Sequence, residues 1–304
     1  MTARRTRPSL LLSATVALSL AVLAGCGAGS ATRSADPVDP VNQGLHDRLP
    51  AAIRASGTIR VGTDASYAPA SFFGPNGRDI VGLEPDLGVA LGKVLGVRLQ
   101  FVNVDFTTML TQVANHKIDL AISAMTDTAE REKQADFINY FSAGTSIVVR
   151  RGNPEAVTDL QDLCGLVVAV EEGTVQVDLL QRSQQRCGRA PIQIRQYPTN
   201  SDALVQLRTG RAVAVLNDFP PAAYLASQAT TKAHYQLAST AQYEPGLYGI
   251  AVAKDQTALR DAVRGALKEV IRTGAYATVL RTWDVTDGAI RQATVNSGRV
   301  QDPS

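Results

Sequence analysis

From Thr58 to Trp283 the sequence alternates between short β-branched segments and segments with helical spacing, and this alternation constrains the fold strongly. The segments TIRVGTD and VRLQFVNV read as strands, and FTTMLTQVANH and IDLAISAM continue the series as a helix and a buried strand. Between the first two strands, residues 83–96 place Leu87, Leu91, Val94 and Leu95 on one helical face. Such a βαβ series predicts a mostly parallel sheet with helices on both faces.

A second series of the same kind begins near Ser146. Its expected strands are SIVVRR, LVVAVE, PIQIRQY, AVAVL and GLYGIAVAK, and its expected helices are 175–186, 201–210, 257–274 and 275–283. The two units do not match each other as a tandem repeat. The sequence therefore predicts an α/β protein with two lobes.

The N-terminus has the pattern of an export signal. Three arginines among the first seven residues precede the uncharged apolar run Ser9–Ala24. Cys26 directly follows Leu23-Ala24-Gly25, which resembles a bacterial lipobox. We expect residues 1–25 to be a cleaved lipoprotein signal peptide and a lipid on Cys26 to anchor the chain to the outer face of the cell membrane.

Two other interpretations of this segment stay open. It could be an ordinary signal peptide with a cysteine by chance, or a membrane anchor, although Gly, Ala and Ser after residue 23 fit a span poorly. The export route, general secretory or twin-arginine, is also open. Residues 26–57, rich in Gly, Ala, Ser, Asp and Pro, read as a flexible tether with room for a short helix at Leu45–Arg54.

Composition and charge exclude several classes of protein. Lys and Arg number 30 and Asp and Glu 28, without a basic run, so we expect no nucleic-acid partner. Three cysteines and three separated histidines give no metal-ligand cluster. No nucleophile elbow, zinc-protease motif, phosphate-binding loop or dinucleotide fingerprint is present. We therefore expect a binding protein with no cofactor and no catalytic residues.

Candidate binding residues follow the predicted strands at several points in both units, and all but one have polar side chains. These residues are Asp64, Tyr67, Ala124, Thr126, Arg131, Glu171, Thr174 and Asp218. In open α/β sheets, ligands bind at the carboxyl ends of the strands. The sequence thus predicts a binding site to which both units contribute.

Several stretches resemble the bacterial extracytoplasmic solute-binding proteins for polar amino acids, family 3. The resemblance rests on IRVGTDASYAPASFF, on DFTTMLTQVANHKIDLAISAMTDTAEREKQADF and on VAVEEGT, AVAVLNDFP and YGIAVAK. It implies a type II periplasmic-binding-protein fold, with two Rossmann-like lobes joined by a two-strand hinge. Lobe 1 would comprise residues 58–145 and 249–284, and residues 146–248 would form lobe 2 with hinge crossings at Ser146–Val149 and Gly246–Gly249. Residues 285–304 would be a C-terminal tail.

The resemblance assigns contacts to the backbone of a bound amino acid. Arg131 would hold the α-carboxylate, and Asp218 would accept hydrogen bonds from the α-ammonium. Thr126 and the backbone of Ala124 would add contacts from lobe 1, and Thr174 would reach the carboxylate from lobe 2. The alternatives are a surface arginine for Arg131 and helix N-caps for Asp218 and Thr174.

The resemblance also assigns contacts to the ligand side chain. Tyr67 and Phe106 would sandwich it, with Phe72 and Phe73 as alternatives or as plain core residues. Asp64 and Glu171 would face the ligand side chain, and two carboxylates there favour a basic side chain. Asp64 alone also occurs in the family's glutamine binders, so a glutamine-like side chain is the alternative. The alternative for Glu171 is a solvated residue at the end of a strand.

The remaining cysteines are expected to pair. Because an exported protein lies in an oxidising compartment, we predict a structural disulfide between Cys164 and Cys187. The alternative is two buried free thiols. Val175 departs from the family pattern, in which some members have a hydroxyl or glycine, and leaves one lobe 2 contact to the carboxylate open.

The resemblance implies a function and partners. The chain would be a lipid-anchored, monomeric receptor that binds a polar L-amino acid and delivers it to the permease subunits of an ABC importer. Two alternatives remain on the same scaffold. One is a periplasmic enzyme of the cyclohexadienyl dehydratase type, in which Glu171 would be a general acid. The other is a receptor that reports amino-acid levels.

Overall fold

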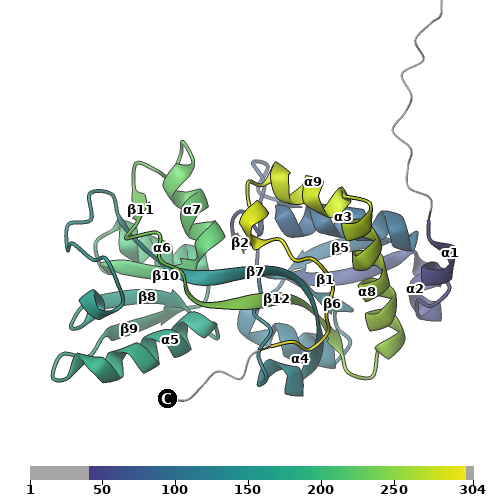
Figure 1. Ribbon diagram of the computed structural model, residues 1–304, viewed down its shortest axis with the longest axis horizontal. Coiled ribbons are helices and arrows are strands. Elements are labelled where there is room, and N and C mark those ends of the chain that lie inside the picture. The colour runs from purple at the N-terminus through teal and green to yellow at the C-terminus, as the bar shows by residue number, and fades with distance from the viewer. Residues whose placement is uncertain (1–40, 299–304) are drawn as a thin grey trace, which may run out of the picture. The chain divides into compact units, whose positions relative to one another are not determined.

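Two long strands cross the middle of the molecule and connect its two halves (Figure 1). They are β7 (Ala135–Arg150) and β12 (Tyr243–Ala253), which pair with each other in antiparallel fashion. The computed structural model describes residues 41–298. In these residues β7 and β12 are the centre of a nine-stranded sheet, and its other strands lie on either side of them.

Lobe 1 lies on the β12 side of this pair. It contains β1 (Thr58–Thr63), β5 (Arg98–Asn103) and β6 (Leu120–Ala121), together with the small sheet β2 (Ser66–Tyr67), β3 (Ser71–Phe73) and β4 (Ile80–Val81). Its helices are α1 (Gln43–His46), α2 (Ala51–Ser56), α3 (Leu83–Leu95), α4 (Met109–Ala114), α8 (Thr257–Arg272) and α9 (Ala275–Thr282). Short 3₁₀ turns at Phe106–Thr108, Arg131–Lys133 and Thr286–Gly288 complete the lobe.

Lobe 2 lies on the β7 side. Its strands are β8 (Val167–Glu171), β9 (Gln193–Tyr197), β10 (Ala214–Asp218) and β11 (Tyr235–Leu237), and its helices are α5 (Val175–Ser183), α6 (Asn200–Arg208) and α7 (Phe219–Ser227). Two 3₁₀ turns, Gln161–Leu163 and Gln184–Cys187, flank β8 and α5. The sheet order is β5-β1-β6-β12-β7-β10-β8-β9, with β11 paired to β7.

The sheet is mixed and not mostly parallel as predicted. Within the lobes, β1 is parallel to β5 and β6, and β8 is parallel to β9 and β10. The two crossing strands are antiparallel to each other and to their neighbours. A chain that leaves lobe 1 along β7 and returns along β12 must reverse direction, which makes this pairing antiparallel.

The hydrophobic cores show where one lobe ends and the other begins. Along β7, Ala143 is the last residue in the lobe 1 core and Ile147 the first in the lobe 2 core. Along β12, Tyr243 packs against lobe 2 and Tyr248 belongs to lobe 1. The crossing on β7 therefore precedes the predicted Ser146–Val149, whose residues already pair with β10 in lobe 2.

Both ends of the described chain pack on lobe 1, which corrects the predicted tether and tail over these residues. In the predicted tether, Leu49 and Ile53 of the α1–α2 region are buried in the lobe 1 core. In the predicted tail, Ala293 is buried, and Asn139 N–H donates to the Thr294 carbonyl at 3.0 Å. Polar hydrogen bonds to β7 hold this last segment, so it carries no hydrophobic period that the sequence could reveal. Cys26 and the signal peptide lie outside the described residues.

An aromatic cluster lies at the boundary between the lobes. Trp283 meets Phe72 edge-on at 5.8 Å between ring centroids, and its indole N–H donates to Asp86 at 2.8 Å. Tyr224 of α7 approaches Phe72 from lobe 2 at 6.2 Å. Trp283 and Tyr224 line one groove between the lobes.

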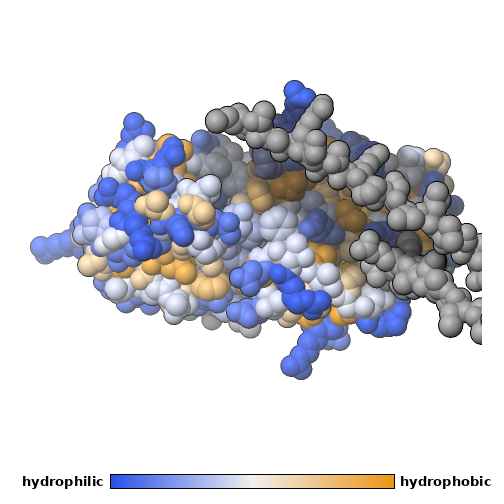
Figure 2. All heavy atoms as spheres, turned by 90° about the horizontal axis from the view of Figure 1, so that it is seen from above, coloured by the Kyte–Doolittle hydropathy of each residue, from blue (hydrophilic) through white to orange (hydrophobic). Residues whose placement is uncertain are grey.

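The surface of the described part is predominantly polar. In Figure 2, apolar residues form small patches among hydrophilic ones. Of the large apolar side chains among residues 41–298, only Val41, Phe73, Val89 and Val205 are classed as exposed. Among the helices of this range, none is long and apolar enough to cross a lipid bilayer.

The predicted disulfide is present in lobe 2. It joins Cys164 to Cys187 with their Cα atoms 5.3 Å apart, and it ties the turn after α5 to the segment before β8. The cysteines are 23 residues apart in sequence. Closing a loop of this length restricts the unfolded chain and stabilises the fold by about 3 kcal/mol.

We expect the double variant Cys164→Ser/Cys187→Ser to lose about 3 kcal/mol of unfolding free energy, because its unfolded chain is no longer cross-linked. Urea denaturation followed by circular dichroism measures the change. A reductant should destabilise the parent by a similar amount and leave the double variant unaffected. Equal midpoints for parent and variant would contradict the prediction.

Candidate functional site

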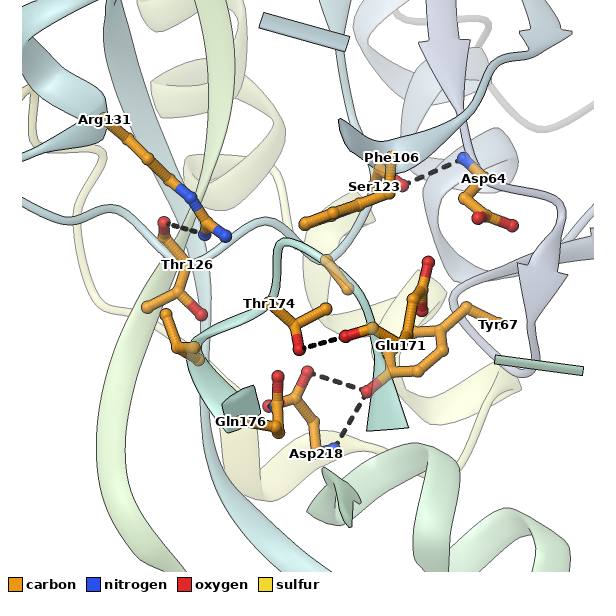
Figure 3. A pocket seen from close by; sticks show the side chains of 12 residues that line it. Asp64, Tyr67, Phe106, Ser123, Thr126, Arg131, Glu171, Thr174, Gln176 and Asp218 are labelled. Carbon is orange, nitrogen blue, oxygen red and sulfur yellow. Dashed lines mark hydrogen bonds between the residues drawn. The ribbon is translucent and has the colours of Figure 1, made fainter. Parts of the chain in front are cut away.

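A polar pocket lies between the lobes, at the carboxyl ends of strands from both. Asp64 follows β1, Ala124 follows β6, Glu171 ends β8 and Asp218 ends β10. All nine ligand-binding residues named from the sequence line this pocket, together with Ser123, Val175 and Gln176 (Figure 3). The parallel strands within each lobe bring these distant residues together at one edge.

Arg131 is not a surface arginine, which was the alternative interpretation. Its guanidinium Nη1 donates to the Thr126 carbonyl at 2.7 Å, and Nη2 donates to the Gly173 carbonyl at 2.9 Å. The group also lies 5.4 Å from the centre of the Phe106 ring, within the range of a cation–π contact. Burial lowers the pKa of Arg131 to about 10, so the group stays charged at neutral pH.

No carboxylate in residues 41–298 forms an ion pair with Arg131. The ion pairs of this range involve other basic residues, on the surface or at its edge. Two carbonyl oxygens hold the guanidinium in place but do not neutralise it. Arg131 is half-buried, and an anion that joins its guanidinium would gain a charge-assisted hydrogen bond.

Asp218 supplies a carboxylate to the same pocket from lobe 2. Its carboxylate accepts hydrogen bonds from the Gln176 amide at 2.8 Å and from the Tyr67 hydroxyl at 3.1 Å. Tyr67 also accepts from the backbone N–H of Asp218 at 2.9 Å. Burial raises the pKa of Asp218 to about 6, although Tyr248, Tyr67, Arg131 and Gln176 all lower it.

Two residues that were expected to be either helix caps or ligand contacts make no cap in the structure. Asp218 stands at the N-cap position of α7 and Thr174 at that of α5, but neither side chain makes a capping hydrogen bond. The Asp218 carboxylate points into the pocket, and the Thr174 hydroxyl donates to the Glu171 carbonyl at 2.8 Å (Figure 3).

Ala124 lines the pocket, but its backbone N–H donates to Glu84 in the core. The carbonyl oxygen is therefore the backbone group that Ala124 can offer to a ligand. Thr126 likewise uses its carbonyl to hold Arg131, which leaves its hydroxyl for the pocket.

Asp64 and Glu171 bring two carboxylates into the pocket from opposite lobes. Both are nearly fully buried, at 5% and 7% exposure, so Glu171 is not the solvated strand-end residue of the alternative interpretation. Burial, followed by the charge of Asp64, raises the pKa of Glu171 well above its usual range. Oε1 of Glu171 is buried without a hydrogen-bond partner in the described part of the chain. This corner of the pocket has an excess of negative charge.

Three pocket residues were not among those named as ligand-binding. Ser123 accepts a hydrogen bond from the Asp64 N–H at 2.9 Å, and Gln176 bonds Asp218. Both lie beside residues that were named, one at a strand end and one in the first turn of a helix. Val175, which stands where some family members have a hydroxyl or glycine, lines the pocket with an apolar side chain. In residues 41–298 no His, Cys, Asp and Glu side chains form a group of three placed to hold a metal ion.

Direct contacts across the pocket show that the two lobes are closed. Arg131 of lobe 1 bonds Gly173 of lobe 2, and Tyr67 of lobe 1 bonds Asp218 of lobe 2. Asn200 of α6 adds a longer bond, 3.5 Å, to the Ser66 carbonyl. Two pocket residues of lobe 1, Arg131 and Tyr67, thus take part directly in the contacts between the lobes.

Two α/β lobes, a pair of crossing strands and a polar pocket between the lobes define the type II periplasmic binding fold. The family model for the bacterial extracellular solute-binding proteins, family 3, matches residues 59–286. The chain belongs to this family.

Individual relatives are similar over most of their length. The arginine-binding protein ArgT of Corynebacterium glutamicum is 29% identical over 262 residues, which are 85% of this chain and 84% of the relative. An ancestral arginine-binding protein, solved once with glutamine and once with arginine, is 33% identical with a TM-score of 0.69 and covers 75% of this chain and 98% of its own. The ancestral amino acid-binding protein AncCDT-1, described as a precursor of cyclohexadienyl dehydratase, is 32% identical with a TM-score of 0.68, over 76% and 97% of the two chains.

The raised pKa values of the pocket acids give the free protein a defined response to pH. Since the pKa of Asp218 is about 6 and that of Glu171 is well above its usual value, the folded protein keeps protons that the unfolded chain releases. Their stabilising effect is complete below the unfolded values of about 4. It is lost as pH rises through about 6 for Asp218 and through a higher pH for Glu171.

We expect Glu171→Gln to stabilise the ligand-free protein by about 1–3 kcal/mol at pH 7.5, because a neutral amide replaces a buried, repelled carboxylate. The variant should also lose less stability than the parent between pH 5 and pH 8. Thermal unfolding across this range measures both effects. Glu172→Gln, at the neighbouring half-buried position, is the matched control and should keep the parent's slope. An equal loss of stability between pH 5 and pH 8 in all three proteins would contradict the raised pKa of Glu171.

Proposed function

We propose that the chain is an extracytoplasmic receptor that binds one L-amino acid between its lobes. The observation that carries the proposal is the pairing of an uncompensated guanidinium, Arg131, with a buried carboxylate, Asp218, in one pocket. An α-amino acid has one anionic and one cationic group a short distance apart. It is the class of ligand that neutralises both poles at once.

The ligand's α-carboxylate would lie against Arg131. The planar guanidinium already donates to two carbonyls in different lobes, so its orientation is fixed before the ligand arrives. The start of α5 would add backbone donors from lobe 2, and the Thr174 hydroxyl would turn from the Glu171 carbonyl, to which it now donates, to the ligand's carboxylate. The α-ammonium would displace the Tyr67 hydroxyl from Asp218 and take over that acceptor.

The ligand's side chain would extend towards Asp64 and Glu171. Two nearly buried carboxylates that face one small space favour a cation between them, and this supports arginine, lysine or ornithine over a neutral amino acid. Tyr67 and Phe106, which line the same pocket, would flank the apolar part of the side chain. ArgT and the arginine-bound ancestral protein support this preference. The glutamine-bound structure supports the glutamine-like alternative.

The same proposal includes delivery to an ABC importer by a monomeric, lipid-anchored receptor. Family membership and the export signal support an extracytoplasmic location. A lipid on Cys26 would keep the receptor near the permease that it supplies. The residues between Cys26 and lobe 1 would give it reach.

A dehydratase is the second candidate, because Glu171 has the raised pKa that suits a general acid and AncCDT-1 is described as a dehydratase precursor. The two functions separate in one assay. Incubation with prephenate and with arogenate should give no product if the chain only binds its ligand. A receptor that reports amino-acid levels would bind as proposed but would not support uptake by cells.

We expect isothermal titration calorimetry of the purified chain to show at least about 100-fold tighter binding of arginine than of citrulline. The two ligands have nearly the same shape, but citrulline leaves Asp64 and Glu171 without a cation. Glu171→Gln should reduce the difference to about tenfold. Equal affinity for arginine and citrulline would reject the basic preference and favour a glutamine-like ligand.

In the same titrations, Arg131→Lys should weaken binding at least about 100-fold, because an ammonium cannot reproduce the bidentate contact to a carboxylate. Arg211→Lys, at an exposed position, is the matched control and should stay within about twofold of the parent. If no free amino acid bound to the parent, the proposed function would be wrong.

We expect Cys26→Ser to move the protein from the membrane fraction to the soluble extracytoplasmic fraction, because a serine cannot take the thioether-linked lipid. Cell fractionation followed by immunoblotting measures the distribution, and metabolic labelling with palmitate shows the lipid on the parent alone. The binding affinity for the amino acid should not change. A membrane-bound Cys26→Ser protein would favour an uncleaved anchor.

A further inference from the structure

Glu84 is a fully buried carboxylate that does not line the ligand pocket. It lies in the first turn of α3, and its two oxygens accept hydrogen bonds from four donors. The donors are the hydroxyls of Thr63, Ser71 and Tyr140 and the backbone N–H of Ala124. Burial raises the pKa of Glu84, and the four donors act against that rise. So many converging donors mark a position where the carboxylate organises its surroundings.

Three of these donors adjoin a pocket residue directly. Thr63 precedes Asp64 at the end of β1. Ser71 pairs with Tyr67 across the β2–β3 ladder. The third donor, Ala124, itself lines the pocket. Glu84 therefore bonds the ends of β1 and β6 directly, and it reaches Tyr67 of β2 through Ser71 of the paired strand β3.

The Ala124 contact also controls Arg131. Ala124 has a φ of +46°, a backbone conformation that residues other than glycine seldom adopt. Its N–H bond to Glu84 holds this turn at the end of β6. Two residues later the Thr126 carbonyl accepts from the Arg131 guanidinium at 2.7 Å. The position of Glu84 is thus transmitted to Arg131 through the three backbone residues 124–126.

Glu84 is itself held firmly. The N–H groups of Leu83 and Glu84 donate to the carbonyls of Pro69 and Ala70 at 2.9 and 3.0 Å. Gly82 has a φ of +139°, and a Cβ there would lie 2.3 Å from the Ala70 carbonyl oxygen, so only glycine fits. The N-terminal end of α3 also favours a negative charge. Tyr140, the fourth donor, belongs to the crossing strand β7.

We propose that Glu84 is the positioning residue of the binding site, which holds the segments carrying Asp64, Tyr67 and Arg131 in one arrangement without touching the ligand. This inference rests on the proposed function, since it explains how lobe 1 presents its contacts to an amino acid. It assigns a binding role to a residue outside the pocket.

The test compares Glu84→Met with Glu84→Gln, by arginine titration at 25 °C and by hydrogen–deuterium exchange of the ligand-free chain. Met keeps the size and accepts no bond from Ala124, so the dissociation constant should rise at least about 30-fold. Gln keeps one oxygen for Ala124 and Tyr140, and the Ser71 and Thr63 hydroxyls can rotate to accept from its amide. It should restore affinity to within about tenfold of the parent.

Asp136→Asn is the matched control for a loss of stability. Asp136 is buried in lobe 1 and pairs with Lys254 and Arg260, but it does not line the pocket. This variant should melt at a lower temperature and still bind within about twofold of the parent. If Glu84→Met bound like the parent, or if Asp136→Asn weakened binding as much, Glu84 would be a structural residue only.

Two further measurements decide the matter where the first comparison gives no result. Should Glu84→Met fail to fold, Ser71→Ala removes a single donor and is expected to weaken binding about threefold, and unchanged binding would overturn the proposal. Should the parent bind no amino acid, the proposed function fails, and exchange in Glu84→Met, or in Ser71→Ala where the Met variant does not fold, then decides. Faster exchange in residues 63–72 and 122–126 than in the parent supports the positioning role, and equal exchange overturns it.

Discussion

Closure of the cleft removes charged groups from water, which costs free energy. The arrangement of the rest of the structure depends on this desolvation. Asp64, Glu171 and Asp218 are all nearly fully buried in the pocket, and Arg131 is the only guanidinium that lines it. The closed cleft therefore holds three acids for one base. Burial raises the pKa values of Asp218 and Glu171, and for Glu171 the charge of Asp64 adds to the rise. A ligand with a net positive charge restores the balance, which links the specificity of the pocket to the closure of the lobes.

Such a site requires rigid walls, because loosely held charges would move apart and admit water. Lobe 1 supplies rigidity through Glu84, whose carboxylate joins the ends of β1 and β6 to the β2–β3 hairpin. In lobe 2, the disulfide fixes the turn after α5 to the segment before β8. The crossing strands then permit the two walls to approach as units.

The sequence predicted the pocket better than it predicted the edges of the fold. Asp218 could be found because it stands at the carboxyl end of a buried strand, whereas Arg131 lies in a later turn and was found through the resemblance of the segment TDTAER to the family. Gln176 carried no such signal, since a glutamine in the first turn of a helix is ordinary. The β2–β4 sheet was missed because strands of two or three residues show no alternation. The last segment was missed because hydrogen bonds of Thr294 and Asn296 help to hold it, and its few packed apolar side chains show no regular spacing.

The aromatic cluster at the lobe boundary makes the molecule its own optical probe. Trp283 is the sole tryptophan in all 304 residues, so indole fluorescence comes from one place. That place is beside Phe72, which Tyr224 approaches from the other lobe. Separation of the lobes would change the packing and the hydration around this one ring. Opening and closing can thus be followed in the unlabelled protein, in real time and without any ligand that carries a signal.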